Sequence, residues 1–165
     1  YSATAGHTAD EQSQAGRRLA LACIEVLRAA PAGAAPVDPA SFEFPPRGKP
    51  RCVGGPDFSI SHSAPLVACA AVSHGEVGLD VECDASVGRL TLATICDEAE
   101  RAIAREKGVL HVWLAKEAAL KAGGGTIEHI GAVRVFAGGA TFRGRRWPAC
   151  VMTSEPGAAF EVRCL

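Results

Sequence analysis

The chain has 165 residues, of which 48% are hydrophobic, enough to build one sizeable core. Its 17 basic and 18 acidic residues nearly cancel, which argues against general nucleic-acid binding, because that function needs a basic surface. No apolar run reaches the roughly 18 residues that suggest a membrane span, so we expect a cytoplasmic protein without membrane attachment. The seven cysteines show no C-x-x-C spacing, which favours reduced core residues over a zinc site or a disulfide framework.

The first half of the chain predicts a helix, a loop and a short antiparallel meander. Thr8 and Glu11 have the spacing of a capping box, and the helix that they open is expected to run to about Ala30, before Pro31. Residues 31–57 are rich in proline, glycine and alanine and predict a loop or linker. Three runs with strand character follow, separated by short turns: 58–62, 66–72 and 76–82. Because side chains alternate along a strand, the first run is expected to carry Phe58, Ile60 and His62 on one side and its serines on the other.

The second half predicts helices followed by further strands. Two helices are expected near 87–106 and 110–122, and Gly123-Gly124-Gly125 ends the second. Residues 130–164 alternate short β-like runs with glycine and proline turns. Strands, then helices, then strands indicate an α+β fold, with an antiparallel sheet and packed helices.

The segment from Gly78 to Glu82 places two carboxylates on one face of an extended chain. Side chains alternate along a strand, so Asp80 and Glu82 point one way while Leu79 and Val81 point the other. Two interpretations stay open: the solvated face of an edge strand, or a site for a divalent cation that offsets the repulsion between like charges. Among cations Mg²⁺ fits best, because it is commonly held by a few carboxylates together with water and substrate phosphates.

The segment from Trp113 to Lys121 plants charges in an apolar stripe. On a helical projection Glu117 and Lys121 lie near the middle of one apolar arc, which consists of Leu110, Trp113, Leu114, Ala118 and Leu120. A surface i,i+4 pair would contribute only about 0.2–0.5 kcal/mol. A charged pair centred on an apolar stripe is costly to desolvate unless something binds it. Both interpretations stay open, and the two charged segments together favour a site for a metal and phosphates.

Lysine is rare in this chain, and its positions are informative. Only four of the 17 basic residues are lysines, and three of these four lie in the segments that carry the candidate chemistry: Lys49, Lys116 and Lys121. A compact ammonium that contacts a phosphate would account for this choice over arginine.

Four motifs, in this order, resemble the signatures of the 4'-phosphopantetheinyl transferases of the surfactin-synthetase-activating type. They are Gly48-Lys49-Pro50, Phe58-Ser59-Ile60-Ser61-His62-Ser63, Gly78-Leu79-Asp80-Val81-Glu82 and Trp113-Leu114-Ala115-Lys116-Glu117-Ala118-Ala119-Leu120-Lys121. The resemblance implies that family's fold, with a shortened N-terminal lobe over residues 1–57 and a catalytic lobe over 58–165 that carries the magnesium and coenzyme A motifs. Where the family has an aromatic pair before a glutamate, this chain has Ile95-Cys96-Asp97-Glu98-Ala99-Glu100.

The resemblance also implies an activity. The enzyme would transfer the 4'-phosphopantetheine arm of coenzyme A to a serine of an acyl or peptidyl carrier protein of fatty acid, polyketide or nonribosomal peptide synthesis, and would release adenosine 3',5'-bisphosphate. The expected partners are coenzyme A and the carrier protein, with no nucleic acid and no membrane, and the expected state is a monomer. The alternative is a non-catalytic relative that binds coenzyme A or a carrier protein.

Carried over motif by motif, the family's site residues fall on seven positions of this chain. The resemblance implies that Mg²⁺ is held by Asp80, Glu82 and Glu117, and that Glu117 also acts as general base toward the serine. It implies that Lys121 assists the leaving group and that the coenzyme A phosphates are contacted by Lys49, His62, Lys116 and Lys121. His62 would meet the 3'-phosphate, and the alternative for His62 is a core or turn histidine.

Two further features have ordinary explanations that we weigh beside functional ones. Trp113 is expected to pack the second helix against the sheet rather than to stack on a ligand. A late basic cluster has solvated strand ends as its default interpretation and docking of an acidic carrier protein as its alternative. This cluster consists of Arg134, Arg143, Arg145 and Arg146.

Overall fold

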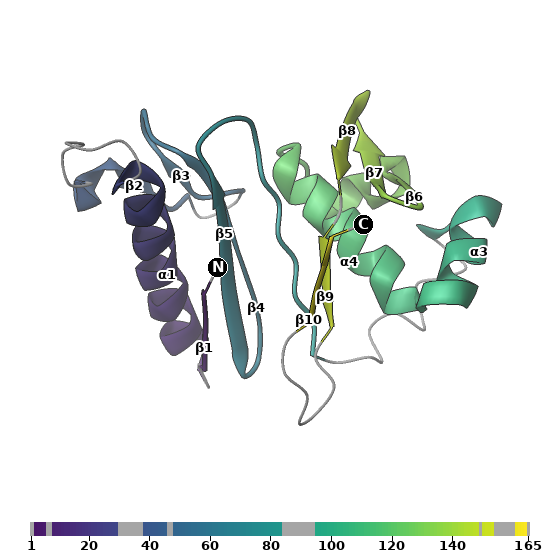
Figure 1. Cartoon of the computed structure of the whole chain (residues 1–165), viewed down its shortest axis with the longest axis horizontal. Helices are drawn as coiled ribbons and strands as arrows, with labels where there is room; N and C mark the ends of the chain where they lie inside the picture. Colours follow the sequence, from purple (N-terminus) through teal and green to yellow (C-terminus); the bar gives the residue numbers. More distant parts are fainter. Residues whose placement is uncertain are drawn as a thin grey trace. The chain divides into compact units, whose positions relative to one another are not determined.

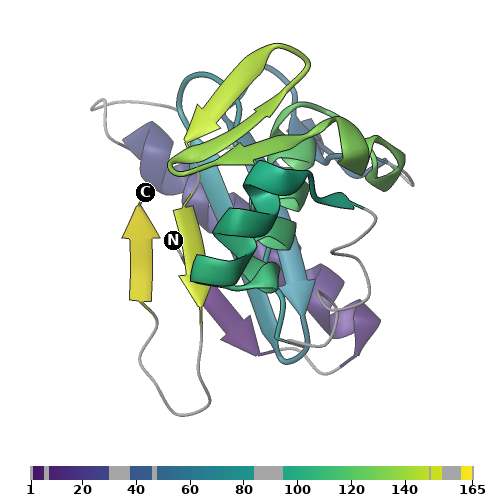
Figure 2. The same ribbon diagram turned by 90° about the vertical axis from the view of Figure 1, so that its right-hand side faces the viewer.

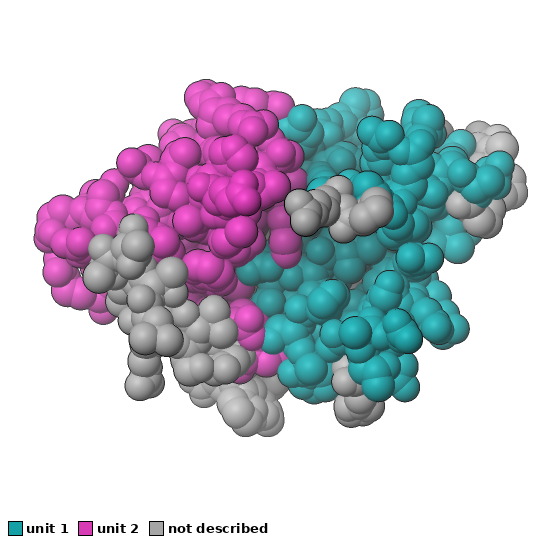
Figure 3. Space-filling view, turned by 180° about the vertical axis from the view of Figure 1, so that it is seen from behind, with its two compact units in different colours: residues 1–81 teal, residues 82–165 magenta. Residues whose placement is uncertain are grey.

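The protein is described by a computed structural model. The structure describes residues 2–5, 8–29, 38–45, 48–83, 95–148, 150–153 and 161–164. It combines helices with small antiparallel sheets (Figure 1), which confirms the α+β class. The chain divides into two compact units, Tyr1–Val81 and Glu82–Leu165, coloured teal and magenta in Figure 3.

The first unit consists of a long helix on a three-stranded antiparallel sheet. The helix α1 spans Ala9–Ala29, and the strands stand in the order β1 (Ser2–Ala5), β5 (Leu66–Val72) and β4 (Asp57–Ser63). The helix packs against β4 and β5, and β4 pairs with β5 over its whole length. This sheet confirms two of the three predicted strands and adds β1, which the sequence did not indicate.

The start of α1 confirms the predicted capping box. The Glu11 backbone N–H donates to Thr8 Oγ1 at 3.2 Å, and the Thr8 backbone N–H donates to Glu11 Oε2 at 2.9 Å. These two bonds satisfy backbone donors that have no partner inside the helix. Residues 30–37, which include Pro31, lie outside the described ranges.

The core of the first unit lies between α1 and the sheet. Its buried members are Leu19, Ala20, Ile24, Cys52, Phe58, Val67 and Cys69. The close approach of helix and sheet depends on Gly16, because a Cβ at that position would lie 2.8 Å from the Ile60 Cγ2 atom. Partly buried Ile60 packs against the same core, so the side of β4 that carries Phe58 and Ile60 faces α1.

Three features of the first unit differ from the sequence prediction. The stretch 31–57 is not all loop: it contains a 3-10 turn (Pro39–Ser41) and a short hairpin of β2 (Phe42–Glu43) and β3 (Arg51–Cys52). The segment 76–82 forms no strand. The boundary between the two compact units lies after Val81 in the sequence, whereas the predicted lobes divide after residue 57. The strands β4 and β5 belong to the first unit because they share one core with α1.

The second unit packs two helices against a three-stranded sheet. Figure 2 shows α3 (Glu98–Lys107) and α4 (Val109–Ala122) in green beside the yellow-green ribbon of β6 to β8. The sheet runs in the order β6 (Arg134–Phe136), β7 (Gly139–Phe142) and β8 (Arg145–Pro148). Two further elements are the 3-10 helix Ile127–Ala132 after α4 and a separate hairpin of β9 (Cys150–Thr153) and β10 (Glu161–Cys164).

The two helices of the second unit lie in the predicted parts of the sequence, but the first is described only from Glu98. The predicted helix 87–106 is observed from Glu98, which follows the N-cap residue Asp97, while residues 84–94 lie outside the described ranges. The second helix ends before Gly123, as predicted. In the ranges that the structure describes, no helix combines the length and apolar character needed to cross a membrane.

The buried face of α4 is not the predicted one. Its buried side chains are Val112, Leu114, Ala115, Lys116, Ala119, Leu120 and Ala122. The predicted arc, centred on Glu117 and Lys121, is therefore wrong in phase, because both residues are only partly buried. Trp113 is partly buried and packs against this core, which confirms its packing role. The charged residue that does lie in the apolar face is Lys116.

Candidate functional site

The predicted site residues belong to both units. Lys49, His62 and Asp80 lie in the first unit, and the other predicted site residues lie in the second: Glu82, Lys116, Glu117 and Lys121. Among the residues that the structure describes, no three histidine, cysteine, aspartate or glutamate side chains gather closely enough to hold a metal ion. The three-carboxylate site therefore stays a prediction from the motifs, and the contacts of each residue are described within its own unit.

The segment that carries Asp80 is held by side chains of β4. Residues 76–82 form no strand ladder with β4. Instead, alternate backbone N–H groups of this segment donate to side-chain oxygens of alternate β4 residues. The three bonds run from Val77 N–H to Asp57 Oδ2 at 2.7 Å, from Leu79 N–H to Ser59 Oγ at 3.0 Å and from Val81 N–H to Ser61 Oγ at 3.3 Å. Both segments repeat every two residues. The side chains of β4 therefore take the place of the backbone carbonyls that would accept these N–H groups in a fourth strand.

Ser61 connects this arrangement to the predicted metal ligand. Its hydroxyl donates to Asp80 Oδ1 at 2.7 Å and accepts the Val81 N–H. Ser61 is buried whereas Asp80 is partly exposed. A hydrogen bond to an ionised carboxylate is stronger than one between neutral groups, so Ser61 fixes the orientation of the Asp80 carboxylate.

Lys49 holds the start of the same segment. Its ammonium forms an ion pair with Asp57 and donates to the Val77 carbonyl at 2.7 Å. Asp57 thereby accepts from both Lys49 and the Val77 N–H. The lysine side chain is 16% exposed. Its described contacts are structural, and its contact with a nucleotide phosphate stays a prediction.

His62 is the exposed end of the apolar side of β4. Phe58 is buried, Ile60 is partly buried and His62 is exposed. The serines of the strand bond to the segment 76–82 on the other side. This confirms the predicted alternation along the strand, and the exposure of His62 excludes the alternative of a core histidine. Its contact with the 3'-phosphate of coenzyme A stays a prediction.

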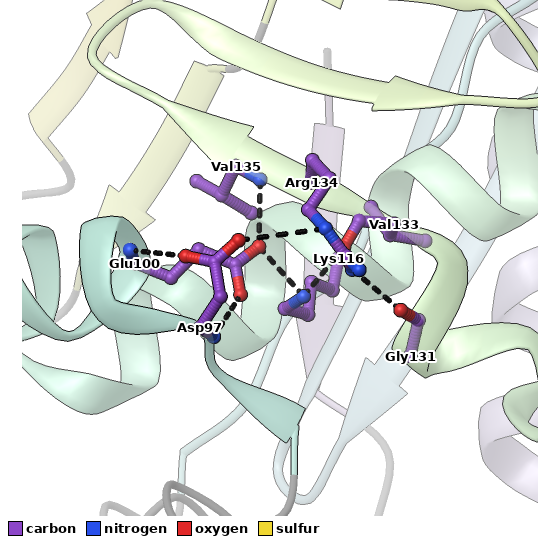
Figure 4. A network of polar contacts seen from close by, with 7 residues as sticks. All are labelled: Asp97, Glu100, Lys116, Gly131, Val133, Arg134 and Val135. Atoms are coloured by element: carbon purple, nitrogen blue, oxygen red, sulfur yellow. Dashed lines mark hydrogen bonds and ion pairs between the residues drawn. The ribbon is translucent and has the colours of Figure 1, made fainter.

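Lys116 lies in the interior of the second unit, where Figure 4 shows its ammonium within a polar network. Lys116 Nζ is 2.7 Å from Glu100 Oε1 and donates to the Val133 carbonyl at 2.6 Å. The two side chains are 0% and 1% exposed. A wholly buried ammonium that is paired with a carboxylate does not reach a ligand that arrives from solvent. We therefore correct the prediction that Lys116 contacts the coenzyme A phosphates: it joins α4 to α3 and to Val133, the residue before β6.

Glu100 completes the network from the start of α3. Its Oε1 also accepts the Val135 N–H at 2.8 Å, and its Oε2 accepts the Asp97 N–H at 3.0 Å. The Asp97 side chain in turn accepts the Glu100 N–H at 2.9 Å, which makes a capping box. One buried carboxylate thus serves a helix cap, a strand and a lysine. Buried charges are tolerated when they are paired and hydrogen-bonded in this way.

Breaking this pair is expected to destabilise the protein. Lys116→Met should lower the free energy of unfolding by about 3–5 kcal/mol, because it leaves the Glu100 carboxylate buried and unpaired. The double variant Glu100→Gln/Lys116→Met should recover part of the loss, since glutamine removes the buried charge but keeps only one of the two oxygens that accept the Val135 and Asp97 N–H groups. Urea denaturation of both variants, with Lys107→Met as an exposed control on α3, measures the difference. A Lys116→Met variant as stable as the control would contradict the buried pair.

Two titratable groups of the second unit are shifted by burial. Burial, and then the charge of Glu100, raises the pKa of the Cys96 thiol. Burial, and then the charge of Lys107, lowers the pKa of His111 on α4. Cys96 therefore stays a neutral thiol at neutral pH. His111 favours its uncharged form, which agrees with a structural role for this histidine.

The sequence prediction missed the structural roles of three residues. Glu100 had a detectable signal, because Asp97 and Glu100 have the spacing of a capping box. Ser59 and Ser61 were placed on the side of the strand opposite to Phe58, but nothing in their spacing named the N–H groups that they accept. Those partners lie about 20 residues further along the chain.

The chain matches no family model and no curated protein. A functional argument therefore depends on the four motifs and on the contacts of their residues.

Proposed function

We propose that this chain is a magnesium-dependent 4'-phosphopantetheinyl transferase with the fold of that family. It would transfer the phosphopantetheine arm of coenzyme A to a serine of an acyl or peptidyl carrier protein. The observation that carries the proposal is that two of the four motifs are bonded to each other. The serine-rich motif supplies Ser59 and Ser61, which hold the Gly-x-Asp-x-Glu motif, and Ser61 donates to the Asp80 carboxylate.

The donor set fits Mg²⁺ by its chemistry. Asp80, Glu82 and Glu117 offer carboxylate oxygens, the ligands that Mg²⁺ prefers, and all three side chains are partly exposed. When bound there, the ion would supply charge neutralisation at the pyrophosphate of coenzyme A.

The remaining chemistry falls to the residues of the chain. The serine oxygen of the carrier protein bonds to the β-phosphorus of coenzyme A, and the bond from that phosphorus to the oxygen of the leaving adenosine 3',5'-bisphosphate breaks. Glu117 accepts the serine proton, directly or through a water molecule. The ammonium of Lys121 neutralises charge on the leaving group. Phosphoryl-type transfer asks a protein mainly for positioning and charge neutralisation, which is what these two side chains of α4 provide.

A direct test uses an apo carrier protein. Incubation with coenzyme A and Mg²⁺ should add the mass of one phosphopantetheine group to the carrier protein, at its serine, and should release adenosine 3',5'-bisphosphate. Omission of Mg²⁺ is the control. Coenzyme A binding without any transfer, over a panel of fatty acid, polyketide and peptide carrier proteins, would contradict catalysis and support the non-catalytic relative.

His62 separates the binding of the nucleotide from the chemistry. Coenzyme A with Mg²⁺ at 100-fold over its dissociation constant should stabilise the protein by about 2.7 kcal/mol, and dephospho-coenzyme A at the same concentration should stabilise it less. The difference should shrink in His62→Ala and persist in His74→Ala, an exposed histidine of the same unit. Thermal melts with each ligand measure it. Equal stabilisation by both ligands in the wild type would remove His62 from 3'-phosphate recognition.

Ser61 is expected to act as a positioning residue for Asp80. Ser61→Ala should lower the affinity of the protein for Mg²⁺ about 10- to 100-fold, the usual effect of removing a hydrogen bond to a metal ligand. Ser59→Ala is a matched control, because Ser59 is also buried on β4 and also accepts an N–H of the segment 76–82. The Mg²⁺ concentration for half-maximal stabilisation by coenzyme A, and for half-maximal transfer, gives the comparison. Equal shifts in both variants would reduce Ser61 to a structural role.

A further inference from the structure

The first unit contains a cavity that no part of the proposed mechanism uses. It measures about 310 Å³ and lies between α1 and β5. Its lining is mostly apolar and includes Val26 and Leu27 of the helix and Ala70 of the strand. Two thiols also line it, Cys23 from α1 and Cys69 from β5.

The two thiols line the same cavity, Cys23 from the helix and Cys69 from the sheet. Cys69 is wholly buried in the core of the first unit, and Cys23 is partly exposed and packs against that core. Burial, and then the charge and hydrogen bond of the Cys23 thiol, raises the pKa of Cys69 to about 12. Cys69 is therefore a neutral thiol at neutral pH. Cys23 is the more accessible of the two and is the one that meets a reagent first.

We propose that Cys23 and Cys69 form a reversible disulfide when the protein meets a small disulfide such as oxidised glutathione. Nothing in the transfer reaction requires this modification, so it does not depend on the proposed function. The partly exposed Cys23 is the thiol that the reagent meets, and three of the cavity's lining residues have small side chains: Ala22, Ala70 and Ala71. The product links α1 to β5. This crosslink lowers the conformational entropy of the unfolded chain.

The reaction proceeds in two exchange steps. The Cys23 thiolate attacks one sulfur of oxidised glutathione, a Cys23–glutathione bond forms, and the first glutathione leaves as its thiolate. Cys69 then loses its proton to solvent and attacks the Cys23 sulfur, which releases the second glutathione thiolate. Two protein thiols are oxidised, and one glutathione disulfide is reduced to two glutathiones. The second step is the slow one, because little Cys69 is ionised.

Peptide mapping tests the pairing. Trypsin places Cys23 in the peptide 19–28 and Cys69 in the peptide 52–89, together with Cys52 and Cys83. The variant Cys52→Ser/Cys83→Ser leaves Cys69 as the only cysteine of the longer peptide. After the folded variant is incubated with oxidised glutathione, we expect the two peptides to be joined, and dithiothreitol should separate them. The oxidised variant should also melt several degrees above its reduced form.

A matched control keeps Cys52 in the same peptide instead. The variant Cys69→Ala/Cys83→Ser should carry glutathione on Cys23 and give no joined peptides, and its melt shows that it is folded. Glutathione found on the exposed Cys83 of the wild type shows that the reagent is active. The proposal is overturned if the first variant stays reduced or stays capped by glutathione at Cys23. It is equally overturned if both variants join the two peptides to the same extent.

Discussion

Asp80→Ala is expected to abolish phosphopantetheine transfer while the protein stays folded. If Asp80 holds Mg²⁺ at the pyrophosphate, its loss removes charge neutralisation from the transition state, which should lower turnover by at least about 10³-fold. Without Mg²⁺ the stability should be unchanged or slightly higher, because one of several repelling carboxylates is gone. The loss of the bond from Ser61 opposes this gain. Turnover with apo carrier protein and thermal melts in EDTA measure the two effects.

Two further variants interpret this result. Asp80→Asn keeps an acceptor for Ser61 but removes the negative charge, so it should retain the stability of the wild type and lose most of the transfer. Glu76→Ala changes an exposed carboxylate of the same segment and should leave transfer intact. Near wild-type transfer by Asp80→Ala in the presence of EDTA would exclude the metal role.

Lys121→Ala is the second change with a large expected effect. If the Lys121 ammonium neutralises the transferring phosphate, its loss should lower turnover by about 10²- to 10³-fold and leave the fold intact, because that interaction strengthens in the transition state. A surface pair with Glu117 would contribute only about 0.2–0.5 kcal/mol to stability and nothing to activity. Turnover at saturating coenzyme A and apo carrier protein distinguishes the two roles.

Lys121→Arg is the sharper probe of the same residue. Arginine keeps the positive charge but spreads it over a planar group, so it does not place a compact ammonium at the same point. We expect a substantial loss of turnover here as well. Lys107→Ala, an exposed lysine on α3, is the matched control and should retain activity. Wild-type turnover in both Lys121 variants would remove Lys121 from the site.

Lys116 and Lys121 show how two lysines of one motif separate by their environment. Lys116 is wholly buried with Glu100, whereas Lys121 is only partly buried near the end of the same helix. Substitution of Lys116 should therefore change the free energy of unfolding. Substitution of Lys121 should change turnover. The two lysines are five residues apart, so they lie on different sides of a helix with 3.6 residues per turn.

The sequence by itself determined the elements that depend on local interactions. The capping box of Thr8 and Glu11 located the start of α1, because both of its bonds lie within four residues. The alternation from Phe58 to His62 assigned each side of β4, because a strand repeats every two residues. The glycines after Ala122 located the end of α4. The order of the four motifs, on which the family resemblance rests, is likewise a property of the sequence alone.

The tertiary structure decided which of several possible faces is buried and what its residues contact. The residues of α4 offer more than one apolar arc, and packing against α3 and β6 selected the one that contains Lys116. The segment 76–82 had the pattern of a strand, but its N–H groups bond to side chains of β4 instead of to a strand backbone. The boundary after Val81 follows from the core that α1 shares with β4 and β5. These outcomes depend on partners about 15 to 50 residues away, and a local pattern does not specify such partners because it contains only the preferences of its own residues.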